Sequence, residues 1–333
     1  MIFTKVNFGM IQFSNKHTEI FGTFIEIIKK YNWNLTIYYN LDNDEYTFLK
    51  YYEKIFGKLD IRPITEINYD LDIFIITSSS DNKNNSDIIE QIAHKSIFIH
   101  HQKIHHKQFM KKTITVSPVI QTADMTMNEY ILPVYRNYKH IHYKSSHSST
   151  KTVFGIIGGI RILGNGVPTD RDLNQLKKFI EAHPDENYEF WIFMRKWDWI
   201  GITKRHRFLA NNPKIVSFAG LNTEQMIKRL HYVKFILPLS KKGGWFYNQR
   251  LTGSIPIAIN FNIPLVIEEK LATIYDLENC SFCYQEDTLE PLIDLITIEK
   301  ETYYNKILEL VKYKRKITKQ NEMNFINLCV KPA

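Results

Sequence analysis

Apolar and polar positions alternate along the chain with two different periods. Short apolar runs predict buried strands, and apolar residues at helical spacing predict the helices between them. The first strands are predicted at Val6–Phe13 and Asn34–Tyr39, with a helix over His17–Tyr31 between them, for which Thr18 is the predicted N-cap. Apolar strands that alternate with helices indicate a parallel sheet with helices on both faces.

The same alternation continues through the first 120 residues. Pro63 cannot donate a hydrogen bond to a central ladder, so the short strand around it is predicted at the edge of the sheet. The predicted helices are 45–57 and 86–93, and the predicted strands are 60–65, 71–80, 95–102 and 113–117.

A second alternation begins near residue 152. Helix starts are predicted at Thr169 or Asp170 and at Asn222 or Thr223. A helix over 246–261 is expected to be kinked or interrupted at Pro256. The other predicted strands are 152–160, 188–194, 213–220, 233–240, 263–267 and 281–285, and the other helices are 289–296 and 299–328.

The segment between the two alternations, Tyr135–Lys151, is polar, basic and rich in serine and histidine, which is typical of a linker. Its histidines lack i, i+4 pairing, so a solvated linker is favoured over a metal site. With 333 residues in the chain, we predict two domains, residues 1–140 and 151–311.

Composition narrows the classes of binding partner and the cellular compartment that are expected for the protein. The formal net charge of +8 favours anionic partners such as phosphates. The three cysteines, Cys280, Cys283 and Cys329, do not make a disulfide scaffold, and a reducing, cytoplasmic setting is expected. The single Cys280–Cys283 pair is read as packing rather than as a metal or redox site. No apolar run is long enough to span a membrane, and the start of the chain reads as a strand rather than a signal peptide. Peripheral membrane contact stays open.

The loops after the strands of the second half combine glycine with positive charge. In open parallel sheets, ligands bind beyond the carboxyl ends of the strands, where helix N-termini favour phosphate. A lysine or arginine alone is usually a surface charge and a glycine alone a turn, and neither a P-loop nor a GxGxxG motif is present. Because the residues occur together, we predict a nucleotide diphosphate site formed by Gly158, Gly159, Arg161, Arg195, Lys196, Lys242, Gly243, Gly244, Trp245, Gln249 and Arg250.

The corresponding loops of the first half carry titratable groups. His17 follows the first strand, Asp81 follows the run 71–80, and His100 and His101 end the strand 95–102. Imidazole and carboxylate are the usual general bases, so His17 and Asp81 are candidates for catalysis. His100 and His101 are candidates for binding the acceptor or a sugar hydroxyl, although a packed or solvated strand end explains them equally well.

The order of these pieces resembles the GT-B glycosyltransferases. The residues that carry the resemblance are "IFIHHQ", "TITVSPVIQTADM" and "EYILPVY" in the first half, and "FGIIGGIR", "IVSFAGLNTEQMIKRL" and "LPLS" in the second. The resemblance implies two Rossmann-like α/β domains whose parallel sheets face each other across a cleft, and a C-terminal helix, about 312–333, that packs back on the first domain. One departure is clear: where the family carries acidic residues around the glycine turn, this chain has Lys242 and Gln249–Arg250.

The resemblance implies a metal-independent transfer of sugar from a nucleotide-diphosphate sugar, either a UDP-sugar or a GDP-sugar. The acceptor would be a glycan, a protein or a small molecule, and neither a cofactor nor nucleic acid is expected. If the reaction inverts, His17 or Asp81 is the expected base; if it retains, no protein base is needed. The alternatives are a GT-B-like sugar-nucleotide epimerase and a non-catalytic basic protein that binds nucleotides or nucleic acid.

Overall fold

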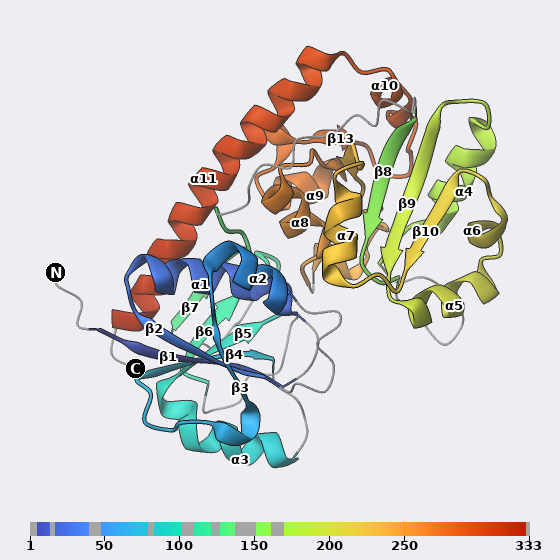
Figure 1. Ribbon diagram of the computed structural model, residues 1–333. Coiled ribbons are helices and arrows are strands. Elements are labelled where there is room, and N and C mark those ends of the chain that lie inside the picture. The colour runs from blue at the N-terminus through green and yellow to red at the C-terminus, as the bar shows by residue number, and fades with distance from the viewer. Residues whose placement is uncertain are drawn as a thin grey trace. The chain divides into compact units, whose positions relative to one another are not determined.

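The computed structural model describes residues 5–13, 17–39, 48–78, 83–101, 110–120, 127–136, 151–160, 170–248 and 250–330. The chain divides into two compact units, Met1–Asn137 with Arg315–Ala333 and Tyr138–Lys314. Each unit has its own parallel sheet (Figure 1). The predicted α/β class is therefore confirmed.

The first unit is a seven-stranded parallel sheet in the order β3-β2-β1-β4-β5-β6-β7. Figure 1 shows α1 and α2 on one face of this sheet and α3 on the other. The strand order reverses direction between β1 and β4, the position where ligands bind in doubly wound sheets. The strands are β1 Asn7–Gln12, β2 Asn34–Tyr39, β3 Asp60–Pro63, β4 Ile73–Ser78, β5 Ser96–His100, β6 Lys112–Thr115 and β7 Met127–Tyr130, and the helices are α1 Phe21–Lys30, α2 Leu49–Phe56 and α3 Lys83–Ile92.

The edges of this sheet test the sequence predictions. Pro63 ends β3 at one edge, as predicted, because an edge strand tolerates a missing N–H. The other edge strand, β7, was not predicted, because "MNEY" has no apolar run to mark it. Strand β2 has the predicted bounds.

Tyr135 corrects the predicted linker. Its side chain is 1% exposed and makes an edge-on ring contact with Tyr52 at 5.6 Å. A Cβ atom added to Gly22 would lie 2.5 Å from the same ring, so a glycine is needed there. Tyr135 is therefore a core residue of the first unit. The rest of the predicted linker, residues 137–150, lies outside the described residues.

The last helix, α11 (Lys300–Val330), contributes its second half to the first unit. Phe325 is fully buried, with ring centroids 5.8 Å from Phe8 and 5.4 Å from Phe24. The side-chain amides of Asn321 and Asn324 donate to the carbonyls of Leu132 and Tyr130 at 2.6 and 2.7 Å. These contacts hold the C-terminal segment in the core of this unit.

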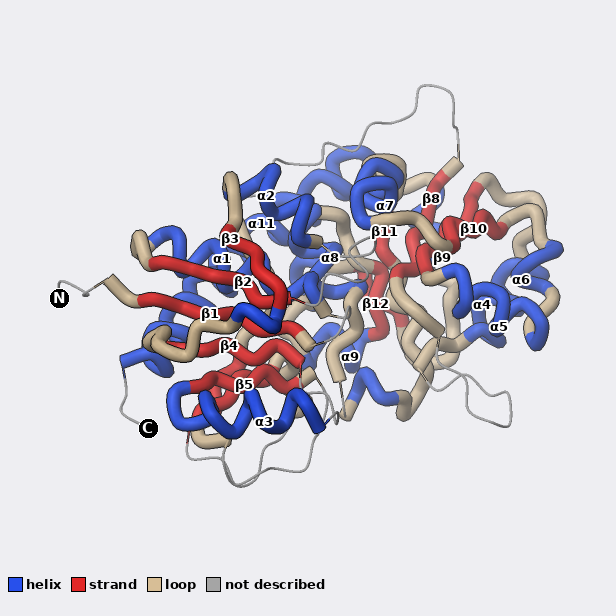
Figure 2. The backbone as a smooth tube through the Cα atoms, turned by 60° about the horizontal axis from the view of Figure 1, so that its bottom comes forward, coloured by secondary structure: helices blue, strands red, loops and turns tan. Residues whose placement is uncertain are grey.

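The second unit has a four-stranded parallel sheet in the order β10-β9-β8-β11. A parallel bridge between Ile236 and Leu265 brings the pair β12-β13 alongside β11 (Figure 2). The strands are β8 Thr152–Ile157, β9 Tyr188–Met194, β10 Ile215–Ala219, β11 Phe235–Ile236, β12 Val266–Glu268 and β13 Phe282–Tyr284. The helices are α4 Leu173–Ala182, α5 Lys196–Arg205, α6 Phe208–Asn211, α7 Thr223–Leu230, α8 Ser254–Phe261, α9 Glu269–Ile274 and α10 Leu292–Ile296.

Two helix starts in this unit differ from the prediction and one agrees. Asp172, rather than Thr169 or Asp170, caps α4 by accepting from the N–H groups of Asn174 and Gln175. Helix α8 begins at Ser254 and not near residue 246; Pro256 then falls in its first turn, where a missing N–H breaks no helical bond. Asn222 forms a capping box at α7, as predicted.

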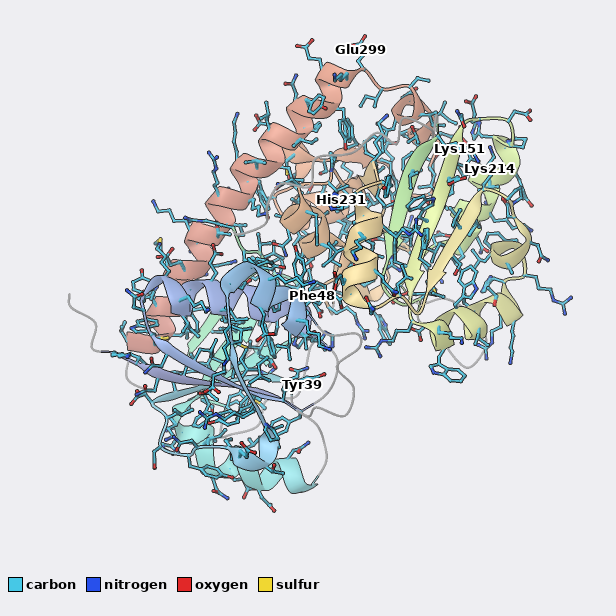
Figure 3. All side chains as sticks on the ribbon, viewed as in Figure 1. Tyr39, Phe48, Lys151, Lys214, His231 and Glu299 are labelled. Atoms are coloured by element: carbon cyan, nitrogen blue, oxygen red, sulfur yellow. The ribbon has the colours of Figure 1, made fainter. Side chains whose placement is uncertain are left out.

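The two ends of the second sheet are distinguished by the direction of its strands. Lys151 and Lys214, labelled in Figure 3, lie at the amino ends of β8 and β10. Figure 1 shows the arrowheads of β8, β9 and β10 at the opposite end, toward α5. The carboxyl ends of these strands form the edge on which a ligand site is expected. In the part of the chain that the structure describes, no helix has both the length and the apolar character to cross a membrane.

Candidate functional site

The order of the second sheet reverses between β8 and β11, and the first residue of α8 lies at this point. The Ser254 hydroxyl donates to the carbonyl of Ile157, the last residue of β8, at 2.9 Å. Gly158 follows with a φ of 99°, which favours glycine. The Ser254 and Ile255 N–H groups bond to Thr252, and Pro256 has no N–H. The positive end of the helix dipole at the start of α8 is therefore what makes this strand end suited to an anion.

A buried arginine that the sequence analysis missed joins the two strands at the same place. The Arg171 guanidinium donates to the carbonyls of Ile157, Gly159 and Pro238, the last two residues lying beyond β8 and β11 respectively. The side chain is 2% exposed, and burial lowers its pKa, with an opposing effect from Asp170. In the sequence, Arg171 reads as a polar residue, and the only signal was its place beside the helix start predicted at Thr169 or Asp170.

In the turn after β11, which contains Lys242, Gly243 and Gly244, the basic side chain is paired with acidic side chains of the same unit. The Lys242 ammonium lies 2.9 Å from a Glu286 carboxylate oxygen and 3.5 Å from one of Asp287. Both carboxylates raise its pKa. Gly243 has a φ of 62° and open space around it. The Lys242 charge predicted for the donor is thus already matched by two acidic side chains.

Trp245 and Arg250 form a stacked pair in this turn. The Arg250 guanidinium carbon lies 4.1 Å from the Trp245 ring centroid, and the Arg250 N–H donates to the Trp245 carbonyl at 3.0 Å. Arg250 is 8% exposed. Gly244 is buried and donates to the Lys241 carbonyl. The turn is therefore held by internal contacts, whereas Gln249 lies outside the described residues.

The loops after β8, β9 and β10 approach one another through glycines. A Cβ on Gly159 would lie 3.2 Å from an Asp198 carboxylate oxygen, and one on Gly220 would lie 3.2 Å from the Lys196 Cβ. Lys196, which was predicted in a loop, is the first residue of α5, and Arg195 is the N-cap of that helix. Both residues are exposed. Gly159, Arg195 and Lys196 thus lie on one edge of the sheet. Arg161 lies outside the described residues.

In the first unit, two of the predicted histidines meet at the carboxyl ends of β1, β4 and β5. The His17 and His101 rings are stacked, with centroids 4.0 Å apart. His101 Nε2 lies 2.8 Å from the Thr77 carbonyl, to which it donates. Burial, reinforced by His17, lowers the pKa of His101 to about 3. His101 is therefore neutral at physiological pH.

Glu19, which the sequence analysis did not select, faces His17. His17 Nδ1 lies 3.4 Å from the Glu19 carboxylate. Burial acts to raise the pKa of Glu19, but the hydrogen bond and charge of His17 outweigh it and lower that pKa. A carboxylate at Nδ1 favours the tautomer with its proton there, which leaves Nε2 as a base.

Helix α2 fixes this segment. The Thr18 hydroxyl accepts from the Phe48 N–H at 3.1 Å, so Thr18 does not cap α1 as predicted. The Tyr52 hydroxyl lies 3.1 and 2.8 Å from the carbonyls of Thr18 and Glu19. His17 itself has a φ of 66°, an uncommon conformation that the surrounding contacts hold in place.

The other two candidates of the first unit are His100 and Asp81. His100 is the last residue of β5 and is 2% exposed, so it lies inside the unit rather than beside His17. Asp81 lies outside the described residues. Among the described residues, no three histidine, cysteine, aspartate or glutamate side chains are grouped so as to hold a metal ion.

No family model matches the chain, and no curated protein matches it by sequence. Solved structures do match over nearly its whole length. Anabaena Alr3699/HepE, in complex with UDP and glucose, has a TM-score of 0.61 at 11% identity, covering 98% of this chain and 100% of its own. A Rickettsia africae glycosyltransferase has a TM-score of 0.58 at 11% identity, covering 98% of this chain and 94% of its own.

A T4 phage β-glucosyltransferase mutant in complex with UDP-glucose has a TM-score of 0.57 at 14% identity, covering 98% of this chain and 100% of its own. These similarities span both units and match the two parallel sheets described above. The chain therefore has the fold of the GT-B nucleotide-sugar glycosyltransferases, as its sequence predicts.

Proposed function

We propose that the protein is a glycosyltransferase that takes a sugar from a nucleotide-diphosphate sugar and binds this donor at the carboxyl edge of the β8–β11 sheet. The observation that carries the proposal is the start of α8 held at the tip of β8 by Ser254. There, the positive end of the helix dipole favours a diphosphate. Two proteins with the same fold were solved with UDP or UDP-glucose.

The departing diphosphate would be stabilised by the protein itself. Gly158 leaves the backbone accessible beside α8, and Arg195 and Lys196 are exposed on the same edge. Fixed dipoles and cations placed where charge develops perform the task that a metal ion performs in other transferases. We therefore propose a metal-independent transfer.

The first unit would provide the base. In an inverting transfer, Nε2 of His17 takes the proton of the acceptor hydroxyl while that oxygen attacks the sugar carbon and the diphosphate leaves with the bonding electrons. The Glu19 carboxylate at Nδ1 stabilises the imidazolium that forms. The neutral His101 ring stacked on His17 adds no repelling charge. Asp81 stays a prediction, and the acceptor is proposed only as a glycan, protein or small-molecule hydroxyl.

Thermal shift with UDP, GDP, CDP and TDP tests the donor site. One diphosphate is expected to raise the melting temperature, since a ligand at a hundred times its Kd stabilises the native state by about 2.7 kcal/mol. Arg250→Ala is expected to weaken that binding about tenfold, because it removes the cation stacked on Trp245. Arg229→Ala is the matched control, since Arg229 stacks on Phe218 at 5.3 Å.

No shift with any diphosphate would contradict the donor site, and equal losses in both arginine variants would assign Arg250 a structural role alone. Turnover of the sugar nucleotide without an acceptor would favour an epimerase instead.

Metal removal tests the proposed chemistry separately. Activity measured as UDP release is expected to be unchanged in EDTA, because the cations and the α8 N-terminus supply the charge that stabilises the diphosphate. The control is the same assay with added Mg²⁺ or Mn²⁺. Loss of activity in EDTA with recovery on adding either ion would overturn metal independence while leaving the transfer itself in place.

A further inference from the structure

The first helix after β9 carries the most exposed large apolar side chain among the described residues. Trp197, in the first turn of α5, is 81% exposed. Gly201 and Lys204 follow at i+4 and i+7 and therefore share its face. Both are exposed, and a Cβ on Gly201 would meet nothing within 4 Å. This side of α5 is open, and Trp197 is the one large apolar side chain exposed on it.

The opposite side of the same helix is firmly anchored. Ile202 is fully buried, and Trp199 packs against the core of the second unit. Leu209 of α6 is 1% exposed and belongs to the same core. The exposure of Trp197 is thus not a consequence of a loosely packed helix. An exposed apolar ring alone does not mark a contact surface, so the charge around it decides what it could contact.

The charge around Trp197 is strongly positive. Between residues 195 and 207 the only acidic residue is Asp198, and the basic residues other than His206 are Arg195, Lys196, Lys204, Arg205 and Arg207. All five of these are exposed. They lie before and after Trp197 along the chain, so the apolar ring has positive charge on both sides. Arg195 and Lys196 are assigned to the donor site, so we call the exposed surface of residues 197–207 the α5 basic face.

We propose that the α5 basic face docks on an anionic membrane surface, with Trp197 inserted among the headgroups. Tryptophan favours the membrane interface because it combines an apolar body with one N–H donor. Lysine and arginine next to it are attracted by anionic lipids. A single exposed ring among exposed cations suits an anionic bilayer surface, whereas single-stranded nucleic acid is bound in basic grooves with successive stacked aromatics.

Co-sedimentation with lipid vesicles tests the proposal. The protein is expected to bind vesicles of phosphatidylcholine with phosphatidylglycerol and not vesicles of phosphatidylcholine alone, and added salt is expected to weaken binding. Trp197→Ala is expected to reduce binding several-fold. The double variant Lys204→Glu, Arg205→Glu is expected to reduce it by at least about tenfold, because it reverses two charges near the lipid surface.

The matched control is Lys177→Glu with Lys178→Glu, which reverses two exposed lysines of α4 in the same unit. It is expected to bind vesicles as the parent does. Equal binding by all variants, or equal loss in the control, would overturn the proposal. So would a gel shift with DNA that needs Trp197 and Lys204 when vesicles do not bind. UDP binding by each variant is measured in parallel, so a failed donor site is recognised independently.

Discussion

Replacing Arg171 with methionine is expected to lower the free energy of unfolding by about 3–5 kcal/mol, because methionine fills much of the space but donates no hydrogen bond. The carbonyls of Pro238 and Gly159 then lose this donor, whereas the Ile157 carbonyl keeps its bond from the Ser254 hydroxyl. Buried carbonyls without partners each cost about 1–3 kcal/mol. The loops beyond β8 and β11 lose their common support, and UDP binding is expected to weaken by at least about tenfold.

Urea unfolding and calorimetric titration with UDP measure the two effects. Arg171→Lys keeps the charge without the planar fork and is expected to recover part of the stability. Arg315→Met, at an exposed position of α11, is the matched control and is expected to change neither quantity. A methionine variant with the stability and UDP affinity of the parent would remove Arg171 from the account of the site.

Acidification below about pH 6.5 is expected to destabilise the first unit through His101. The folded-state pKa of His101 is lowered to about 3, against an ordinary value near 6.5. Between these values the unfolded chain binds a proton that the folded chain excludes. Stability contributed by this group is therefore complete above about pH 6.5 and is lost as pH falls toward 3, by up to about 1.4 kcal/mol per pH unit.

His101→Gln removes the imidazole that takes up this proton in the unfolded chain. The unfolding free energy of the variant is therefore expected to depend less on pH between about 4 and 6.5. Glu19, whose pKa is lowered, adds a loss at more acidic pH that persists in the variant. His94→Gln, at an exposed position, is the control and is expected to leave the slope unchanged. An unchanged slope in His101→Gln would show that His101 titrates normally.

The backbone architecture was largely readable from periodicity. Strands β2 and β9 have the predicted bounds, because each is a run rich in apolar and aromatic residues between polar segments. Strand β7 was missed because it lacks such a run. The start of α8 was misplaced because residues 246–253 mix apolar and polar residues as an amphipathic helix does, whereas the helix begins only at Ser254.

The site was less readable, because side-chain burial and pairing depend on the fold. Arg171 and Lys242 are both basic residues near glycines in the sequence, yet one is buried against carbonyls and the other is exposed and paired with acids. His17 and His101 are distant in the chain and meet only because β1, β4 and β5 are neighbours. The glycines of the site were easier to predict. Gly158 and Gly243 have positive φ angles, a backbone conformation that favours glycine whatever the side-chain packing.

The discontinuous make-up of the first unit has a consequence for biosynthesis. Its sheet is encoded within the first 137 residues, but Phe325, Asn321 and Asn324 come from a segment translated after the whole second unit. Until residues 315–330 emerge from the ribosome, Phe8 and Phe24 lack their contact with the Phe325 ring, and the carbonyls of Tyr130 and Leu132 lack the bonds from the two asparagine amides. The unit that is synthesised first is therefore completed last. Until then its nascent form exposes apolar surface, the kind of surface for which cells need molecular chaperones.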